Sequence, residues 1–171
     1  MPEPADILIS VADVYVTQIL NGLKTVELRR RTLRISPGTR IWIYAKSPRS
    51  HVQAVAIADQ IVTAPPEDIW RDFKNRVGIS FDEFTKYFDG TARGCAVLLK
   101  QIGRIDPEIP LNELRQRIKH FHPPQFFKKL KAEGPEVEFF KSRTLSTSSQ
   151  ARLPKPPDGV YPAFALRSRV R

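Results

Sequence analysis

The chain is poor in cysteine and in long apolar runs. Its 171 residues include one cysteine, Cys95, which excludes an intramolecular disulfide and a zinc site built on several cysteines. No run approaches the roughly 18 apolar residues of a membrane-spanning helix, and the N-terminal segment carries acids without a basic start. We therefore expect a reduced, cytoplasmic protein with no signal peptide and no membrane partner.

The signatures of several common enzyme classes are also absent. The sequence has no P-loop, no GxGxxG fingerprint and no nucleophile elbow. His120 and His122 are spaced to share a metal ion, but no third ligand accompanies them at the spacing of a metal site. We expect neither a metal nor a cofactor, and nucleotide hydrolysis by those routes has no sequence support.

Acidic residues are scarce where basic residues gather. The chain has 28 lysines and arginines against 18 aspartates and glutamates, a formal net charge of +10. Residues 24–49 contain eight basic residues and one acid, and residues 141–171 contain seven and one. The remainder of the chain is mildly acidic. Two local basic blocks favour a polyanionic partner such as nucleic acid over a merely solubilising surface, which usually mixes both signs.

Apolar alternation and helical spacing predict a series of short elements. Strands are expected at residues 7–11, 24–31, 40–45, 51–62 and 94–102. Helices are expected to begin near residues 13, 65, 80, 110 and 123. In the third of these helices, Ser80 and Glu83 are spaced as a capping box, and Phe81, Phe84 and Phe88 are expected in the core.

The order of these elements lacks the periodicity of a doubly wound sheet. We expect an α+β protein built on a small mixed β-barrel of about five to six strands with inserted helices. Residues 1–133 are expected to form this domain. Residues 134–171 are basic and rich in serine and proline, which predicts a C-terminal extension, partly disordered or folding back on the barrel. Within it, residues 160–166 (VYPAFAL) are apolar enough to dock.

Four features in order resemble those of one known family. Residues 22–29 (GLKTVELR) resemble the GxKxxExR motif of the ASCH family, a branch of the PUA-like β-barrels. Residues 43–48 (IYAKSP) are similar to its YAxSP strand end, and the paired helices within residues 65–90 stand where ASCH proteins carry an insertion. Residues 122–126 (HPPQF) are similar to its PPQSF segment, although Phe127 shifts the pattern slightly. The resemblance covers roughly residues 6–130.

The resemblance implies a PUA-like barrel with a cleft beside the strand that carries GxKxxExR. It implies binding of nucleic acid, RNA more than DNA, or of a nucleotide. Ribonuclease and acylated-cytidine amidohydrolase activities occur among relatives, so a small hydrolytic enzyme using Lys24 and Glu27 stays open, as does a module for modified bases or DNA. The amidohydrolases use a Lys-x-x-Thr arrangement. Here Glu27 stands at the hydroxyl position, which argues against that mechanism but leaves a general base for water.

The candidate binding residues lie in and around these motifs. Lys24 suits a phosphate, or a proton-transfer role if it is buried. Glu27 and Arg29 share one face of a strand, where they form either an ion pair or contacts to a base and a phosphate. Trp42 and Tyr44 share another face, and Tyr44 is expected to stack a base unless it packs in the core. The full candidate set is Lys24, Thr25, Glu27, Arg29, Arg31, Tyr44, Lys46, Ser47 and Arg49.

Overall fold

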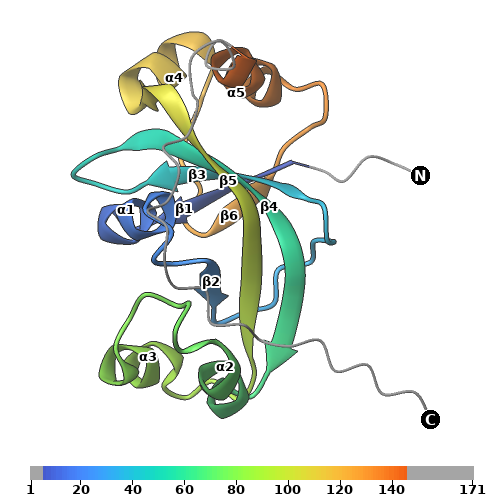
Figure 1. Ribbon diagram of the computed structural model, residues 1–171. Coiled ribbons are helices and arrows are strands. Elements are labelled where there is room, and N and C mark those ends of the chain that lie inside the picture. Colours follow the sequence, from blue (N-terminus) through green and yellow to red (C-terminus); the bar gives the residue numbers. More distant parts are fainter. Residues whose placement is uncertain (1–5, 146–171) are drawn as a thin grey trace, which may run out of the picture.

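A mixed sheet of six strands curls into a half-barrel and supports the rest of the fold (Figure 1). The computed structural model describes residues 6–145. The strands are β1 (Ile7–Val11), β2 (Val26–Arg29), β3 (Arg40–Ala45), β4 (His51–Ala64), β5 (Gly94–Pro110) and β6 (Phe127–Lys129). They lie in the order β2-β5-β4-β3-β1-β6. The α+β, PUA-like architecture expected from the sequence is confirmed.

The two longest strands give the sheet its curvature. β4 and β5, of 14 and 17 residues, pair antiparallel, and their register shifts at three places along the ladder. Such bulges bend a strand and increase its twist, so the two strands wrap around the core. β1 pairs in parallel with β3, whereas the other pairs are antiparallel.

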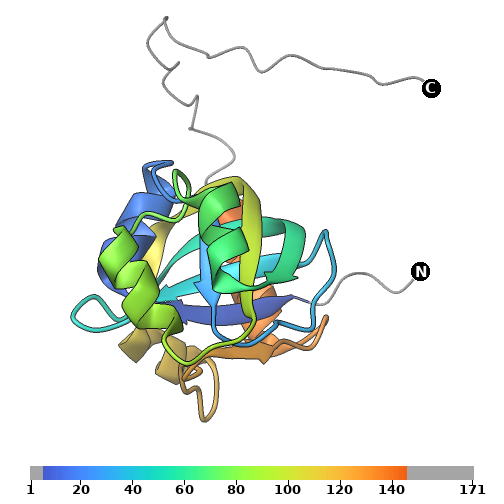
Figure 2. The ribbon, with the colours of Figure 1, turned by 90° about the horizontal axis from the view of Figure 1, so that it is seen from below.

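In the described part of the chain, five helices occupy the edges and ends of the curled sheet. They are α1 (Asp13–Leu20), α2 (Pro66–Phe73), α3 (Phe81–Phe88), α4 (Leu111–Arg117) and α5 (Pro135–Leu145). α2 and α3 lie at one end of the molecule and α4 and α5 at the other; Figure 2 views it from the α2–α3 end. Within residues 6–145, no helix is long and apolar enough to span a bilayer.

Opposite faces of the sheet belong to different apolar clusters. Ile41 and Ile43 of β3 pack with α1 in one cluster, while Trp42 and Tyr44 pack with α4 and α5 in another. The alternation in the sequence therefore assigned the two faces of β3 correctly. A third cluster joins α2 and α3 to β2 and β5.

Two expectations about phenylalanines are wrong. The segment after Pro123 and Pro124 is extended instead of helical, and it ends in β6, which pairs with the edge of β1. The backbone pairs that β1 offers on this edge outweigh the short apolar pattern that suggested a helix. Phe81 is 57% exposed and lies against Trp70, because the core-facing side of α3 is taken by Phe84 and Phe88. The capping box of Ser80 and Glu83 is confirmed.

The described fold continues past the boundary expected at residue 133. α5 packs on the sheet through Val137 and Phe140, and the Phe140 ring lies 5.2 Å from the Trp42 ring, centroid to centroid. Residues 135–145 thus contribute to the second cluster although their composition resembles a tail. The expectations for residues 146–171, including the docking of residues 160–166, lie outside the described residues.

Truncating α5 at its buried ring tests whether this helix is part of the core. Phe140 is fully buried, so Phe140→Ala is expected to lower the free energy of unfolding by about 3–5 kcal/mol. Denaturant unfolding measures this loss. Glu138→Ala on the exposed side of α5 is the matched control and is expected to change stability by less than about 0.5 kcal/mol. Equal stability of the two variants would show that α5 does not pack as described.

Candidate functional site

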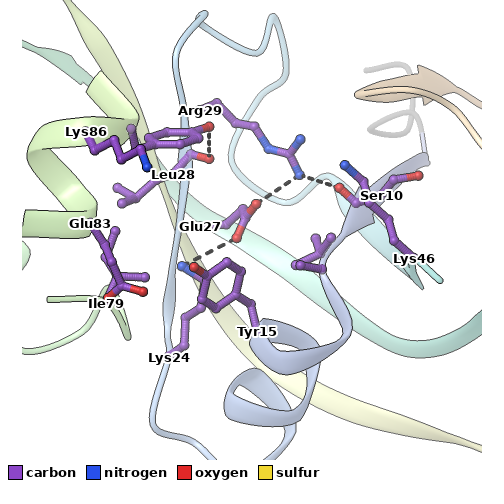
Figure 3. A pocket seen from close by; sticks show the side chains of 13 residues that line it. Ser10, Tyr15, Lys24, Glu27, Leu28, Arg29, Lys46, Ile79, Glu83 and Lys86 are labelled. Carbon is purple, nitrogen blue, oxygen red and sulfur yellow. Dashed lines mark hydrogen bonds and ion pairs between the residues drawn. The ribbon is translucent and has the colours of Figure 1, made fainter. Parts of the chain in front are cut away.

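A cavity of about 430 Å³ opens between α1, β2 and α3 (Figure 3). We call it the central cavity. Its charged lining residues are Lys24, Glu27, Arg29, Lys46, Glu83 and Lys86. Two tyrosines, Tyr15 from α1 and Tyr87 from α3, line it as well. The cavity therefore lies beside the strand that carries the GxKxxExR pattern, where the resemblance to ASCH proteins implied a cleft.

Two glycines bring Lys24 to the base of this cavity. Gly22 has φ of +75°, a conformation that favours glycine, and it lets the chain turn back at the end of α1. The backbone N–H of Lys24 then donates to the Gln18 carbonyl. Gly78 lies against this turn, and a Cβ there would come within 2.2 Å of Gln18 Oε1 and 3.0 Å of Lys24 Cβ. The close approach of the two segments thus depends on Gly78.

Lys24 is buried, and its ammonium group has both a carbonyl and a carboxylate beside it. Its residue is 3% exposed, its Nζ donates to the Val77 carbonyl at 2.7 Å, and it lies 3.6 Å from Glu27 Oε2. Burial lowers the pKa of Lys24, and the neighbouring Glu27 carboxylate opposes that shift. Lys24 thus meets the condition of burial that the sequence analysis set for a proton-transfer role.

The Glu27 carboxylate bridges two cations. Its Oε1 lies 2.9 Å from Arg29 Nη2, while Oε2 faces Lys24. Arg29 also donates to the carbonyls of Ser10, at 3.3 Å, and Phe126, at 3.4 Å. Its buried Nε has no hydrogen-bond partner among the described residues. The ion-pair alternative for Glu27 and Arg29 is therefore realised, and the array of two cations and one carboxylate carries a net positive charge into the cavity wall (Figure 3).

The rim of the central cavity is also positive. Lys46 and Lys86 are exposed and line it. Glu83 is committed to α3, because it accepts hydrogen bonds from the backbone N–H and the hydroxyl of Ser80. The bond from the Ser80 backbone is the main reason that the pKa of Glu83 is lowered. The rim therefore carries two lysines and one ionised carboxylate, that of Glu83.

Sequence reasoning missed the two tyrosines. Lys24 Nζ lies 5.5 Å from the centroid of the Tyr15 ring, within cation–π range. The Tyr87 hydroxyl donates to the Leu28 carbonyl of β2 at 3.1 Å. Burial is the largest cause that raises the pKa of both phenols, so both stay protonated at neutral pH. No local motif marks them, since α1 and α3 meet only in the folded chain.

The nine candidate residues predicted from the sequence do not all line the central cavity. Four of the nine candidates line the central cavity, namely Lys24, Glu27, Arg29 and Lys46. The Thr25 hydroxyl accepts from Arg76 Nε instead. Tyr44 is 4% exposed in the second cluster, so its ring packs in the core and offers no surface for a base to stack on. Ser47 is exposed after β3, and Arg49 pairs with Glu108 at 3.3 Å.

A second cavity, of about 710 Å³, adjoins the first. The two share Arg29 and Tyr87 in their linings. We call it the arginine cavity, because Arg29, Arg30 and Arg31 line it and no acidic residue does. The predicted residue Arg31 therefore belongs here. Among residues 6–145 there is no group of three or more histidines, cysteines, aspartates or glutamates placed to hold a metal ion.

Comparison with known proteins places these cavities within a matched region. A family model described as "Domain of unknown function (DUF365)" matches residues 5–129, a range that contains every residue lining the two cavities. A curated relative, the "ASCH domain-containing ribonuclease" of Zymomonas mobilis, is 32% identical over 133 residues. This match covers 78% of the chain described here and 89% of that protein.

Solved structures agree with this match. The crystal structure of ASCH from Zymomonas mobilis is 30% identical, with a TM-score of 0.73 over 83% of this chain and 94% of that one. A serine-to-alanine variant of that protein gives 0.75 at 30% identity, over 83% and 98% of the two chains. The N-terminal domain of Staphylothermus marinus McrB, at 13% identity and a TM-score of 0.51 over 81% and 93%, shares the fold.

Removing the charge of the Glu27 carboxylate tests whether it holds Lys24 and Arg29 together. Glu27→Gln leaves Lys24 and Arg29 buried beside each other without a counter-ion, so we expect a loss of about 3–5 kcal/mol in the free energy of unfolding. Denaturant unfolding measures it. In the double variant Lys24→Met/Glu27→Gln part of the loss should be recovered, because one buried cation has gone. Additive losses in the double variant would contradict the bridging role.

The buried lysine also predicts a pH dependence of stability. Burial lowers the pKa of folded Lys24 below its ordinary value of 10.5, so between these two pKa values the unfolded chain binds more protons than the folded one. Its contribution to the free energy of unfolding therefore rises with pH in that window. Urea unfolding from pH 7 to about 10 should show a steeper rise for the wild type than for Lys24→Met. Other titrating groups are common to both proteins, and parallel curves would refute the shift.

Proposed function

The chain belongs to the ASCH domain family, and from that premise we propose that it binds single-stranded RNA through the central cavity. The observation that carries the proposal is the buried array of Lys24, Glu27 and Arg29 at the base of a cavity with a basic rim. RNA as the ligand is supported by the similarity to the Zymomonas mobilis relative, which is a ribonuclease.

The chemistry of the cavity suits a nucleotide with an accessible base. Glu27 has acceptor sites for an exocyclic amino group, and the Arg29 guanidinium beside it lines the same cavity. The exposed ammonium groups of Lys46 and Lys86 are placed at the rim for phosphate oxygens. The cavity thus offers hydrogen-bonding groups to the edge of a base and positive charge to a phosphate.

A single strand fits this arrangement better than a duplex. The base-facing groups lie in a cavity between two helices and a strand, and a paired and stacked base presents its edge inside a groove instead. RNA recognition by sequence mostly uses unstacked bases that enter such sites. We therefore propose that the ligand is unpaired where it meets the cavity.

Cleavage of the bound strand is the second candidate function. It is favoured by the similarity to the Zymomonas mobilis relative, which is a ribonuclease. The adjacent proton donor and acceptor, Lys24 and Glu27, favour it as well. In this step the ribose 2′-oxygen attacks phosphorus and passes its proton to Glu27. The bond from phosphorus to the 5′-oxygen breaks, and that oxygen takes a proton from Lys24, whose pKa is lowered by burial. The products are a 2′,3′-cyclic phosphate and a 5′-hydroxyl.

Binding is tested by fluorescence anisotropy with labelled single-stranded RNA and matched duplex DNA over a salt series. For the single strand, the slope of log affinity against log salt should be about −0.7 per phosphate contacted. Lys46→Ala/Lys86→Ala should weaken binding and make that slope shallower by about 1.4, because two phosphate contacts are lost. Lys119→Ala, which removes an exposed lysine that lines neither cavity, should bind as the wild type does.

The same samples, run on a denaturing gel, separate binding from cleavage. An intact probe identifies a binding module, whereas a shortened probe that stays intact with Lys24→Met and with Glu27→Gln identifies a ribonuclease. Cleavage that persists in both variants contradicts the proton-transfer pair. Absence of binding to either polymer overturns the RNA proposal in favour of a small nucleoside, and a preference for the duplex favours a module for DNA or modified bases.

A further inference from the structure

We infer that the arginine cavity holds the nucleotide next to the one in the central cavity, so that the ligand is a strand of at least two nucleotides. This inference rests on the proposed function and names its substrate class. It assigns a site to residues that the GxKxxExR pattern leaves unexplained, above all Phe126 and Arg31. It also separates a polymer ligand from a free nucleoside or mononucleotide, which would need the central cavity alone.

The two cavities lie side by side, as a strand that enters both requires. Arg29 and Tyr87 belong to both linings, so these two residues form the wall that the cavities share. Arg29 is held between them by Glu27 on one side and by the Phe126 carbonyl on the other. A phosphate that links two nucleotides would therefore pass the guanidinium of Arg29, whose planar donors suit phosphate oxygens.

Phe126 offers an aromatic surface on a fixed backbone. Its residue is 63% exposed. Its carbonyl accepts from the Ser10 backbone N–H at 3.2 Å and from Arg29 at 3.4 Å, and the Ser10 hydroxyl donates to the Pro124 carbonyl at 2.6 Å. The ring is thus presented to solvent from an anchored segment, as expected of a platform on which a base stacks.

The charges of the arginine cavity match a phosphate backbone. Arg30 is oriented by the hydroxyl of Thr91, at 3.0 Å, and by the Asp89 carbonyl, at 2.7 Å. Arg31 is exposed and has no hydrogen bond or ion pair with any residue from 6 to 145. With no acidic side chain in the lining, this surface attracts a polyanion and disfavours a purely apolar peptide.

The test compares a 5′-mononucleotide with a short single-stranded RNA, each titrated against the wild type and the variants Phe126→Ala and Arg31→Ala. For the oligonucleotide, Phe126→Ala should lower affinity roughly tenfold, because one base loses its stacking partner. Arg31→Ala should make the salt slope shallower by about 0.7, because one phosphate contact is lost. Binding of the mononucleotide should not change in either variant.

Matched controls separate these losses from general effects. Phe81→Ala removes another exposed phenylalanine, and Arg117→Ala removes an exposed arginine; neither residue lines a cavity, and both variants should bind the oligonucleotide as the wild type does. Phe126→Trp should keep or raise the affinity because it keeps an aromatic face. Phe126→Leu should behave as Phe126→Ala, which shows that stacking and not apolar bulk is lost.

The outcomes distinguish this inference from the proposal on which it rests. If the wild type binds no RNA, the proposed function fails. If it binds RNA but Phe126→Ala and Arg31→Ala bind the oligonucleotide equally well, the proposed function stands and the second nucleotide site is overturned. Equal affinity of the wild type for the mononucleotide and the oligonucleotide overturns it as well.

Discussion

The contact on which the candidate site depends is the bridge that the Glu27 carboxylate forms between Lys24 and Arg29. Two cations in a site so shielded from water need a counter-charge, since water cannot solvate them there. The bridge also ties separate parts of the chain together, because Lys24 bonds to the carbonyl of Val77 and Arg29 to those of Ser10 and Phe126. The turn after α1, the end of β1 and the segment that enters β6 are therefore joined through the side chains of Lys24, Glu27 and Arg29.

This arrangement explains why one strand, β2, contributes both to the core and to the candidate site. Its buried face packs with α2 and α3 through Val26 and Leu28, while Glu27 and Arg29 face the central cavity. A strand alternates its side chains, so four residues supply both a piece of the core and the charged base of a cavity. Arg29 then extends the charged surface to the arginine cavity, where the exposed Phe126 ring lies. The two cavities together form a surface with the basic and aromatic character that single-stranded nucleic acids bind.

Local patterns carried much of this information. The alternation of residues 40–45 predicted both the strand and the separate faces of Ile43 and Trp42, and the spacing of Ser80 and Glu83 predicted the cap of α3. The short motif around Lys24 located the cavity. The patterns failed where a partner from far along the chain decided the outcome. The segment before β6 became extended because β1 offered an unpaired edge. Residues 135–145 pack on the barrel because Trp42 and its neighbours offer an apolar surface, a choice between disorder and folding back that the composition had left open.

The sequence alone thus determined the family, the mixed β-rich architecture and the strand that carries Glu27 and Arg29, because each depends on side chains close together in the chain. Only the tertiary structure decided which predicted residues share a cavity. It buried Tyr44, turned Thr25 toward Arg76, and brought Tyr15 and Tyr87 to Lys24 and β2 from two helices. It also decided that Lys24 is desolvated, which lowers its pKa. Burial and cavity walls arise from contacts between distant segments, and no local spacing encodes those contacts.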